Sequence, residues 1–156
     1  MRPLLFFLLL LAVLASCGNR VTSYWGDLPP SEPLRVLPEI DNYVSMTIHE
    51  ICENQRYATV RIHNRSLHTA IAGSYFRVEY FNATDWKQIP SRGGDLLGFF
   101  SNIVAQVHPG EYGDVTKDLW RFASLRPGLY RIRKYVLIRI DGFSYSHDVV
   151  AEFTWM

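Results

Sequence analysis

The chain has 156 residues and a nearly even charge balance, with 16 Lys and Arg residues against 15 Asp and Glu residues. This balance excludes the basic surplus typical of nucleic-acid-binding proteins, so we expect no nucleic-acid partner. Aromatic residues make up 14% of the sequence and β-branched residues gather in short runs, which favours an all-β domain.

An apolar run from Leu4 to Ala15 follows the single charge of Arg2. It is shorter than the roughly 20 residues that cross a hydrocarbon core, so it predicts a removable signal peptide over residues 1–16. The stretch Leu14-Ala15-Ser16-Cys17 resembles the lipobox of bacterial lipoproteins. The resemblance implies cleavage before Cys17, a thioether-linked diacylglycerol on its thiol and a further acyl chain, such as palmitate, on its amino group. Two or more chains give a stable membrane anchor.

The second cysteine, Cys52, has no intramolecular partner once Cys17 carries lipid. A disulfide framework is therefore excluded, and we expect Cys52 to be a shielded thiol. Lipidation places the protein in the cell envelope with the membrane as a partner. Gly18 stands where an Asp favours retention in the inner membrane, so we expect an outer-membrane lipoprotein that faces the periplasm.

Residues 17–42 hold four of the eight prolines and show neither helical nor strand periodicity. Repeated proline biases a chain toward extended forms, so this stretch predicts a lipidated N-terminus and a tether that docks partly on the domain. Residues 43–156 are of suitable length for one domain with its own core.

Alternation of apolar and polar residues predicts about seven strands in this domain, separated by turn signals. No long amphipathic helix is visible, so we expect an antiparallel β-sandwich. The predicted strands lie within residues 43–51, 56–64, 73–81, 86–90, 100–108, 131–140 and 143–155.

The stretch LRPGLY has the L-x-P-G-x-Y form of a tyrosine corner. Pro127 and Gly128 supply the backbone angles of a tight turn, and Leu125 precedes them. Tyr130 then begins the next strand, with its hydroxyl in reach of backbone a few residues upstream. A plain Pro-Gly turn before a strand is the alternative.

Residues 44–156 resemble a family of bacterial immunoglobulin-like (Ig-like) domains. The resemblance implies an Ig-like β-sandwich and brings no catalytic residues. His108 departs from the family pattern, which has an apolar residue before the Pro-Gly-Glu turn. The segments that carry the resemblance are MTIHEI, YATVRIHNRS, YFRVEYFNATDWKQIP, VHPGEYGDVTKDL, LRPGLYRIRKYV and VVAEFTW.

One sheet face is a candidate binding surface, because arginine forks and aromatic planes suit an acidic or glycan partner. The alternative is a solvated face with cross-strand ion pairs, partly neutralised by Asp148 and Glu152. The candidate residues are Tyr75, Arg77, Arg131, Arg133 and Tyr135.

No G-x-S-x-G elbow or phosphate-binding loop is present, so the sequence predicts no enzyme and no cofactor. We expect no metal, although His49 and His63 can share one surface if their strands pair. The favoured function is a non-catalytic binding or scaffolding module with an envelope protein or glycan as partner. A periplasmic ligand- or metal-binding module and a protease inhibitor are the alternatives.

Overall fold

The structure is a computed structural model that describes residues 28–38, 40, 43–91, 105–122 and 124–156. The expected signal peptide, Cys17 and the start of the tether lie outside these residues, as does Ile103 of one expected strand. The described residues are all-β apart from one 3₁₀ turn, η1 (Leu119–Arg121). None of the described residues forms a helix long and apolar enough to cross a membrane.

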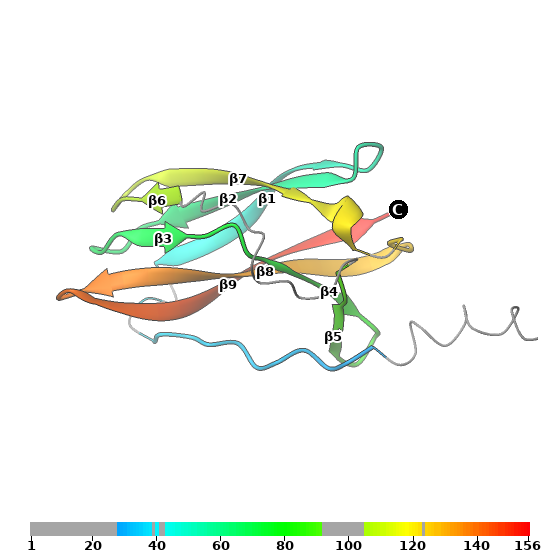
Figure 1. Cartoon of the computed structure of the whole chain (residues 1–156), viewed down its shortest axis with the longest axis horizontal. Helices are drawn as coiled ribbons and strands as arrows, with labels where there is room; N and C mark the ends of the chain where they lie inside the picture. The colour runs from blue at the N-terminus through cyan, green and yellow to red at the C-terminus, as the bar shows by residue number, and fades with distance from the viewer. Residues whose placement is uncertain (1–27, 39, 41–42, 92–104, 123) are drawn as a thin grey trace, which may run out of the picture.

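Two antiparallel sheets pack face to face (Figure 1). The small sheet has the order β1-β2-β7, and the large sheet has the order β5-β4-β8-β3-β6 with β9 paired to β8. The nine described strands are β1 (Val44–Cys52), β2 (Tyr57–Asn64), β3 (Ala70–Ala72), β4 (Arg77–Phe81), β5 (Trp86–Ile89), β6 (Ala105–Val107), β7 (Tyr112–Asp118), β8 (Gly128–Ile140) and β9 (Phe143–Trp155).

The long hairpin β8–β9 is the main structural unit of the large sheet. Its two strands pair over 13 positions, from Gly128 opposite Trp155 to Ile140 opposite Phe143. The connecting residues Asp141 and Gly142 both have positive φ, as a two-residue hairpin turn requires. On its other edge, β8 pairs first with β4 and then with β3, so this strand joins both halves of the sheet.

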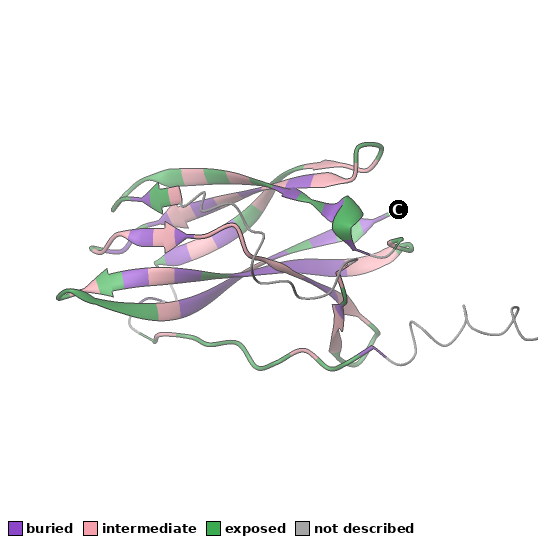
Figure 2. Cartoon of the chain, viewed as in Figure 1, coloured by how far each residue is buried: buried purple, intermediate pink, exposed green. Residues whose placement is uncertain are grey.

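The core lies between the sheets, where buried positions alternate with exposed ones along the strands (Figure 2). The predicted inward alternation of Val44 and Met46 is found in β1, and that of Ala58, Val60 and Ile62 in β2. The Ig-like antiparallel sandwich expected from the sequence is confirmed in its fold class.

Two strands, β3 and β7, are present that the sequence analysis did not predict. β3 has only three residues, too few to show a period. β7 reads YGDVTKD, which is mostly polar and contains residues disfavoured in strands. Both are stabilised by pairing, β3 between β6 and β8 and β7 against β2, so tertiary context decides their structure.

Tyr130 makes contacts of the kind that define a tyrosine corner. Its ring is fully buried, and its hydroxyl donates to the backbone O of Arg126 at 2.8 Å. The same hydroxyl accepts from the backbone N of Arg126 at 3.1 Å. The preceding Gly128 lies against the ring of Tyr80 with φ of +157°. A side chain at this position would meet that ring.

Two lysines, Lys117 of β7 and Lys134 of β8, lie buried inside the sandwich. Lys117 Nζ donates to O of Ser74 at 2.9 Å, and Lys134 Nζ donates to O of Gly73 and O of Tyr75. No ion pair joins either amine to a carboxylate among the described residues. Burial lowers the pKa of Lys117 to about 8. Burial, together with repulsion from Lys117, lowers the pKa of Lys134 to about 7.

We expect Tyr130→Phe to lower the free energy of unfolding by about 1–3 kcal/mol, because it removes the hydroxyl from a buried hydrogen-bonded position. Chemical denaturation with intrinsic fluorescence measures this change. Tyr145→Phe is the matched control, since Tyr145 is 43% exposed. Equal stability of the two variants would contradict a structural role for the Tyr130 hydroxyl.

The buried lysines predict that thermal stability rises between pH 7 and pH 9.5. Their folded-state pKa values lie below the unfolded value, so over this range the unfolded chain binds more protons and a rise in pH favours the folded state. Lys134→Met should flatten the dependence, whereas Lys87→Met, which changes a lysine outside the core, should preserve it. Differential scanning calorimetry across this range tests the sign, and a falling wild-type profile contradicts it.

Candidate functional site

The N-terminal segment of residues 28–38, here called the strap, crosses the outer face of the large sheet (Figure 1). At one end it pairs with the edge strand β5: Ser31 N donates to O of Trp86, and Gln88 N donates to O of Pro29, each at 3.0 Å. Pro30 forms a bridge with Lys87. The strap therefore extends the sheet beyond β5.

At its other end, the strap is fixed to β9. Arg35 N donates to Oδ2 of Asp148 at 2.6 Å, and Asp148 N donates to O of Arg35 at 2.7 Å. Leu37 N also donates to Nδ1 of His147 at 3.1 Å. The strap thus joins β5 to β9 across the intervening strands β4 and β8. Residues of the stretch interpreted as a tether thus contact the domain through these hydrogen bonds.

A chain of alternating charges lies beneath the strap. Glu79 of β4 has no exposed surface, and its Oε2 accepts from Nε of Arg131, its cross-strand partner on β8. Its Oε1 lies 3.5 Å from a guanidinium nitrogen of Arg133. Arg133 then donates to Oδ2 of Asp148 at 2.7 Å. Each charge in this chain has an opposite neighbour, which offsets the cost of burial.

Arg133 also holds the strap directly. Its guanidinium donates to O of Glu32 at 2.5 Å and to O of Pro33 at 2.8 Å. Two residues earlier on β8, the guanidinium carbon of Arg131 lies 4.3 Å from the ring centre of Trp86 on β5. Arg131 and Arg133 are therefore only 9% and 5% exposed, in contrast to the open surface expected for them. The strap and β5 cover both.

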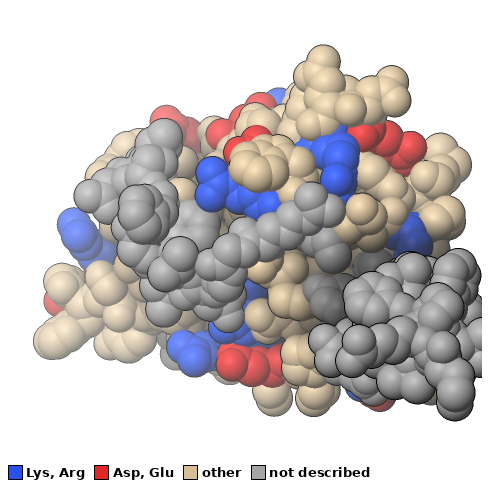
Figure 3. Space-filling view, turned by 45° about the vertical axis from the view of Figure 1, so that its right-hand side comes forward, with Lys and Arg blue, Asp and Glu red and all other residues tan. Residues whose placement is uncertain are grey.

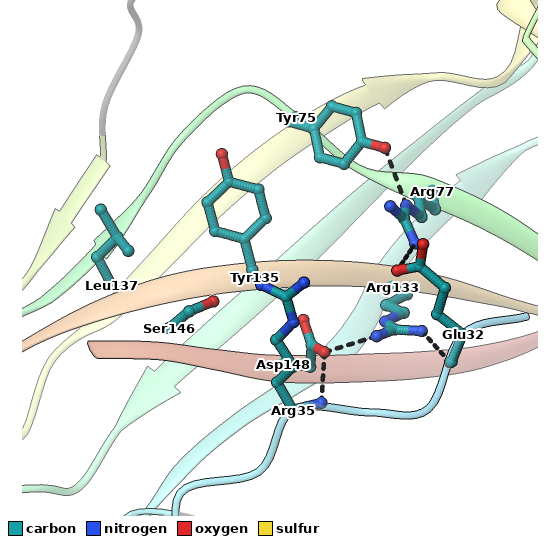
Figure 4. A pocket seen from close by; sticks show the side chains of 9 residues that line it. All are labelled: Glu32, Arg35, Tyr75, Arg77, Arg133, Tyr135, Leu137, Ser146 and Asp148. Carbon is teal, nitrogen blue, oxygen red and sulfur yellow. Dashed lines mark hydrogen bonds and ion pairs between the residues drawn. The ribbon is translucent and has the colours of Figure 1, made fainter. Parts of the chain in front are cut away.

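The other three candidate residues, Tyr75, Arg77 and Tyr135, lie around a groove of about 380 Å³ between the strap and the sheet (Figure 4). Arg133 forms part of its wall, whereas Arg131 does not reach it. The full lining consists of Glu32, Arg35, Tyr75, Arg77, Arg133, Tyr135, Leu137, Ser146 and Asp148.

An ion pair closes one side of this groove. Arg77 donates to Oε2 of Glu32 at 2.9 Å and to the hydroxyl of Tyr75, also at 2.9 Å. The hydrogen bond and charge of Arg77 hold the pKa of Glu32 below its usual range. Burial opposes the charge on Arg77, but its bonds to Tyr75 and Glu32 outweigh this and raise its pKa. Both groups stay charged near neutral pH.

Outside the groove, the surface seen in Figure 3 shows basic and acidic side chains next to one another. On the small sheet, Arg61 and Asp114 form an ion pair with a contact of 2.7 Å. The visible described surface therefore carries no large field of one sign, in agreement with the even charge balance.

The histidines considered as metal ligands have other neighbours. His49 Nε2 lies 3.3 Å from a nitrogen of Arg61, and the ring of His63 stacks on Tyr112 with centroids 4.1 Å apart. Within the part of the chain that the structure describes, no three His, Cys, Asp or Glu side chains gather as a metal site. Cys52 is a free, half-buried thiol.

Sequence reasoning missed Glu32, Arg35, Leu137 and Ser146 as groove residues. Glu32 and Arg35 lie in the stretch interpreted as a tether, where no periodicity indicates which side chains face the domain. Ser146 and Leu137 are directly opposite each other on the β8–β9 hairpin. That register was available from the two predicted strands and the Asp-Gly turn between them.

Comparison with known proteins gives one informative match. A search of curated proteins found none that matches. Among solved structures, the archaellum periplasmic stator protein complex FlaF and FlaG from Sulfolobus acidocaldarius is 12% identical, with 80% of this chain and 100% of that chain covered. Its TM-score of 0.34 supports no conclusion about this protein. A family model described as a bacterial Ig-like domain matches residues 40–154. The chain therefore belongs to the family of bacterial Ig-like domains.

Proposed function

We propose that this protein is a lipid-anchored, non-catalytic binding module of the bacterial cell envelope. In this proposal residues 1–16 are removed, Cys17 carries the lipid, and the Ig-like domain of residues 43–156 faces the periplasm from the outer membrane. The lipobox-like sequence before Cys17 supports the anchor. The family supports a fold that presents binding surfaces, and the site must supply the specificity.

The groove between the strap and the sheet is the observation that carries the binding function. Its walls come from the strap, from β4, β8 and β9, and from Tyr75 in the connection before β4, and ion pairs and hydrogen bonds join them. Concave sites with a few oriented polar groups and aromatic walls are typical of ligand binding. Arg and Tyr side chains are suited to bind an envelope protein or a glycan.

The charges of the groove also favour binding over catalysis. Glu32 and Asp148 each pair with an arginine, at 2.9 Å and 2.7 Å. A general base works best with a pKa near the working pH, whereas Arg77 lowers the pKa of Glu32. These carboxylates are therefore suited to hold arginines and accept hydrogen bonds.

The anchor and the groove are close along the chain. Pro29, where the strap meets β5, lies 12 residues after Cys17. A fully extended chain of that length spans about 40 Å at most. An anchor at Cys17 thus holds the β5 end of the domain near the membrane surface, with the groove on the face beneath the strap.

Replacing Cys17 by Ala should abolish lipidation, since no thiol then remains to carry the acyl chains that anchor the protein. Cys52→Ala is the matched control and should stay membrane-bound. Intact-mass spectrometry of each fraction reads out the added lipid. A Cys17→Ala protein that still carries the added lipid mass, or a wild-type protein without it, would contradict the anchor.

A photo-crosslinking side chain placed at Tyr135 should yield a discrete higher-mass adduct in intact cells, whether the partner is a protein or a glycan polymer. The same side chain at Tyr112, which is 62% exposed on the other sheet, should not yield it. Gel electrophoresis of the purified protein compares the two. Identical adduct patterns, or none from Tyr135, argue against the groove as the binding site.

A further inference from the structure

One guanidinium in the groove, that of Arg35, acts on Glu32 only through its charge and takes no hydrogen-bonded or ion-pair partner among the described residues. The lining contains three arginines and two carboxylates, and two pairs account for Arg77 with Glu32 and Arg133 with Asp148. The guanidinium of Arg35 makes no hydrogen bond or ion pair with any residue that the structure describes. One positive charge is therefore left to meet a ligand.

Hydrogen bonds fix the backbone from which this side chain extends. Arg35 exchanges two hydrogen bonds with Asp148, through its N at 2.6 Å and its O at 2.7 Å. Its side chain extends from the strap into the groove lining that Tyr135 and Asp148 share (Figure 4). A donor group on a fixed backbone loses less freedom on binding than one on a mobile loop.

Two tyrosine rings line the same groove. The rings of Tyr75 and Tyr135 have centroids 5.9 Å apart and planes inclined by 38°. Tyr135 is 39% exposed, so part of its ring is open to solvent. Aromatic rings of this kind offer an apolar face to the carbon skeleton of a ligand and a hydroxyl to its polar groups.

The remaining lining combines donors and acceptors. Ser146 supplies a hydroxyl, and the carboxylates of Glu32 and Asp148 retain oxygen lone pairs beyond those bound by arginine. Sugar hydroxyl groups both donate and accept, so they match such a mixed lining. The groove volume of about 380 Å³ is near the lower end of ligand pockets and suits one or two sugar rings.

We propose that the groove binds a carboxylated sugar residue, with the carboxylate on Arg35 and the sugar ring against Tyr75 and Tyr135. This inference rests on the proposed function, because it names the ligand class for the same groove. Arginine forms strong charge-assisted bonds to carboxylates. A neutral sugar would leave the Arg35 charge without its counterpart.

The test compares methyl β-glucuronoside with methyl β-glucoside, which differ in the carboxylate. Each glycoside is titrated into the protein, and binding is followed by changes in the NMR chemical shifts of the protein. At low salt, the glucuronoside should bind at least about tenfold more tightly than the glucoside. Added salt should reduce that preference. Chemical-shift changes should centre on the backbone amides of Arg35, Tyr135 and Asp148.

Arg35→Gln should remove the preference for the charged sugar while leaving the fold intact, because the strap is held through the Arg35 backbone. Arg139→Gln is the matched control, since Arg139 is an exposed arginine on the same strand as Tyr135 and lies outside the groove lining. Equal binding of both glycosides, or an unchanged preference in Arg35→Gln, overturns the inference. If neither glycoside binds while crosslinking from Tyr135 persists, the ligand class is wrong and the binding module stands.

Discussion

The outer layer of this domain depends on the buried carboxylate of Glu79. A fully buried charge requires opposite partners: cross-strand pairing places Arg131 directly opposite Glu79, and Arg133, two residues further along β8, reaches its other oxygen. Removing one partner of such a group typically costs about 3–5 kcal/mol. Because Arg133 has donors left over, it also binds Asp148 and the carbonyls of Glu32 and Pro33. The position of the strap, and so the groove, follows from where Glu79 is buried.

Strand β8 links the core to the groove, because its side chains alternate between the two faces of the sheet. Arg133 and Tyr135 point to the groove, whereas Lys134 between them points into the sandwich. The Lys134 amine donates to O of Tyr75, so it fixes the backbone of a residue in the opposite groove wall. Residues 133–135 of β8 therefore position both aromatic walls of the groove, Tyr75 and Tyr135.

Much of the fold was predictable from local pattern. Alternation over residues 131–140 and 143–155 predicted both long strands. The Asp-Gly pair between them, which the sequence analysis did not single out, forms their turn with positive φ. The same alternation placed Arg77, Arg133 and Tyr135 on one face. The local pattern does not show that the strap covers that face. Arg35 meets Asp148 across 113 residues, and no period in the Pro-rich strap encodes such a contact.

The strap also changes how the sheet edges meet other chains. An open edge strand presents unpaired N–H and C=O groups, which can template pairing with a second molecule and lead to aggregation. The strap occupies backbone groups of β5 through Pro29 and Ser31, and of β9 through Arg35. Pro30 and Pro33 have no N–H group, so the strap is itself a poor template for a further strand. Proteolytic loss of these few residues would therefore expose two unpaired sheet edges at once, so the strap protects the domain against edge-to-edge self-assembly.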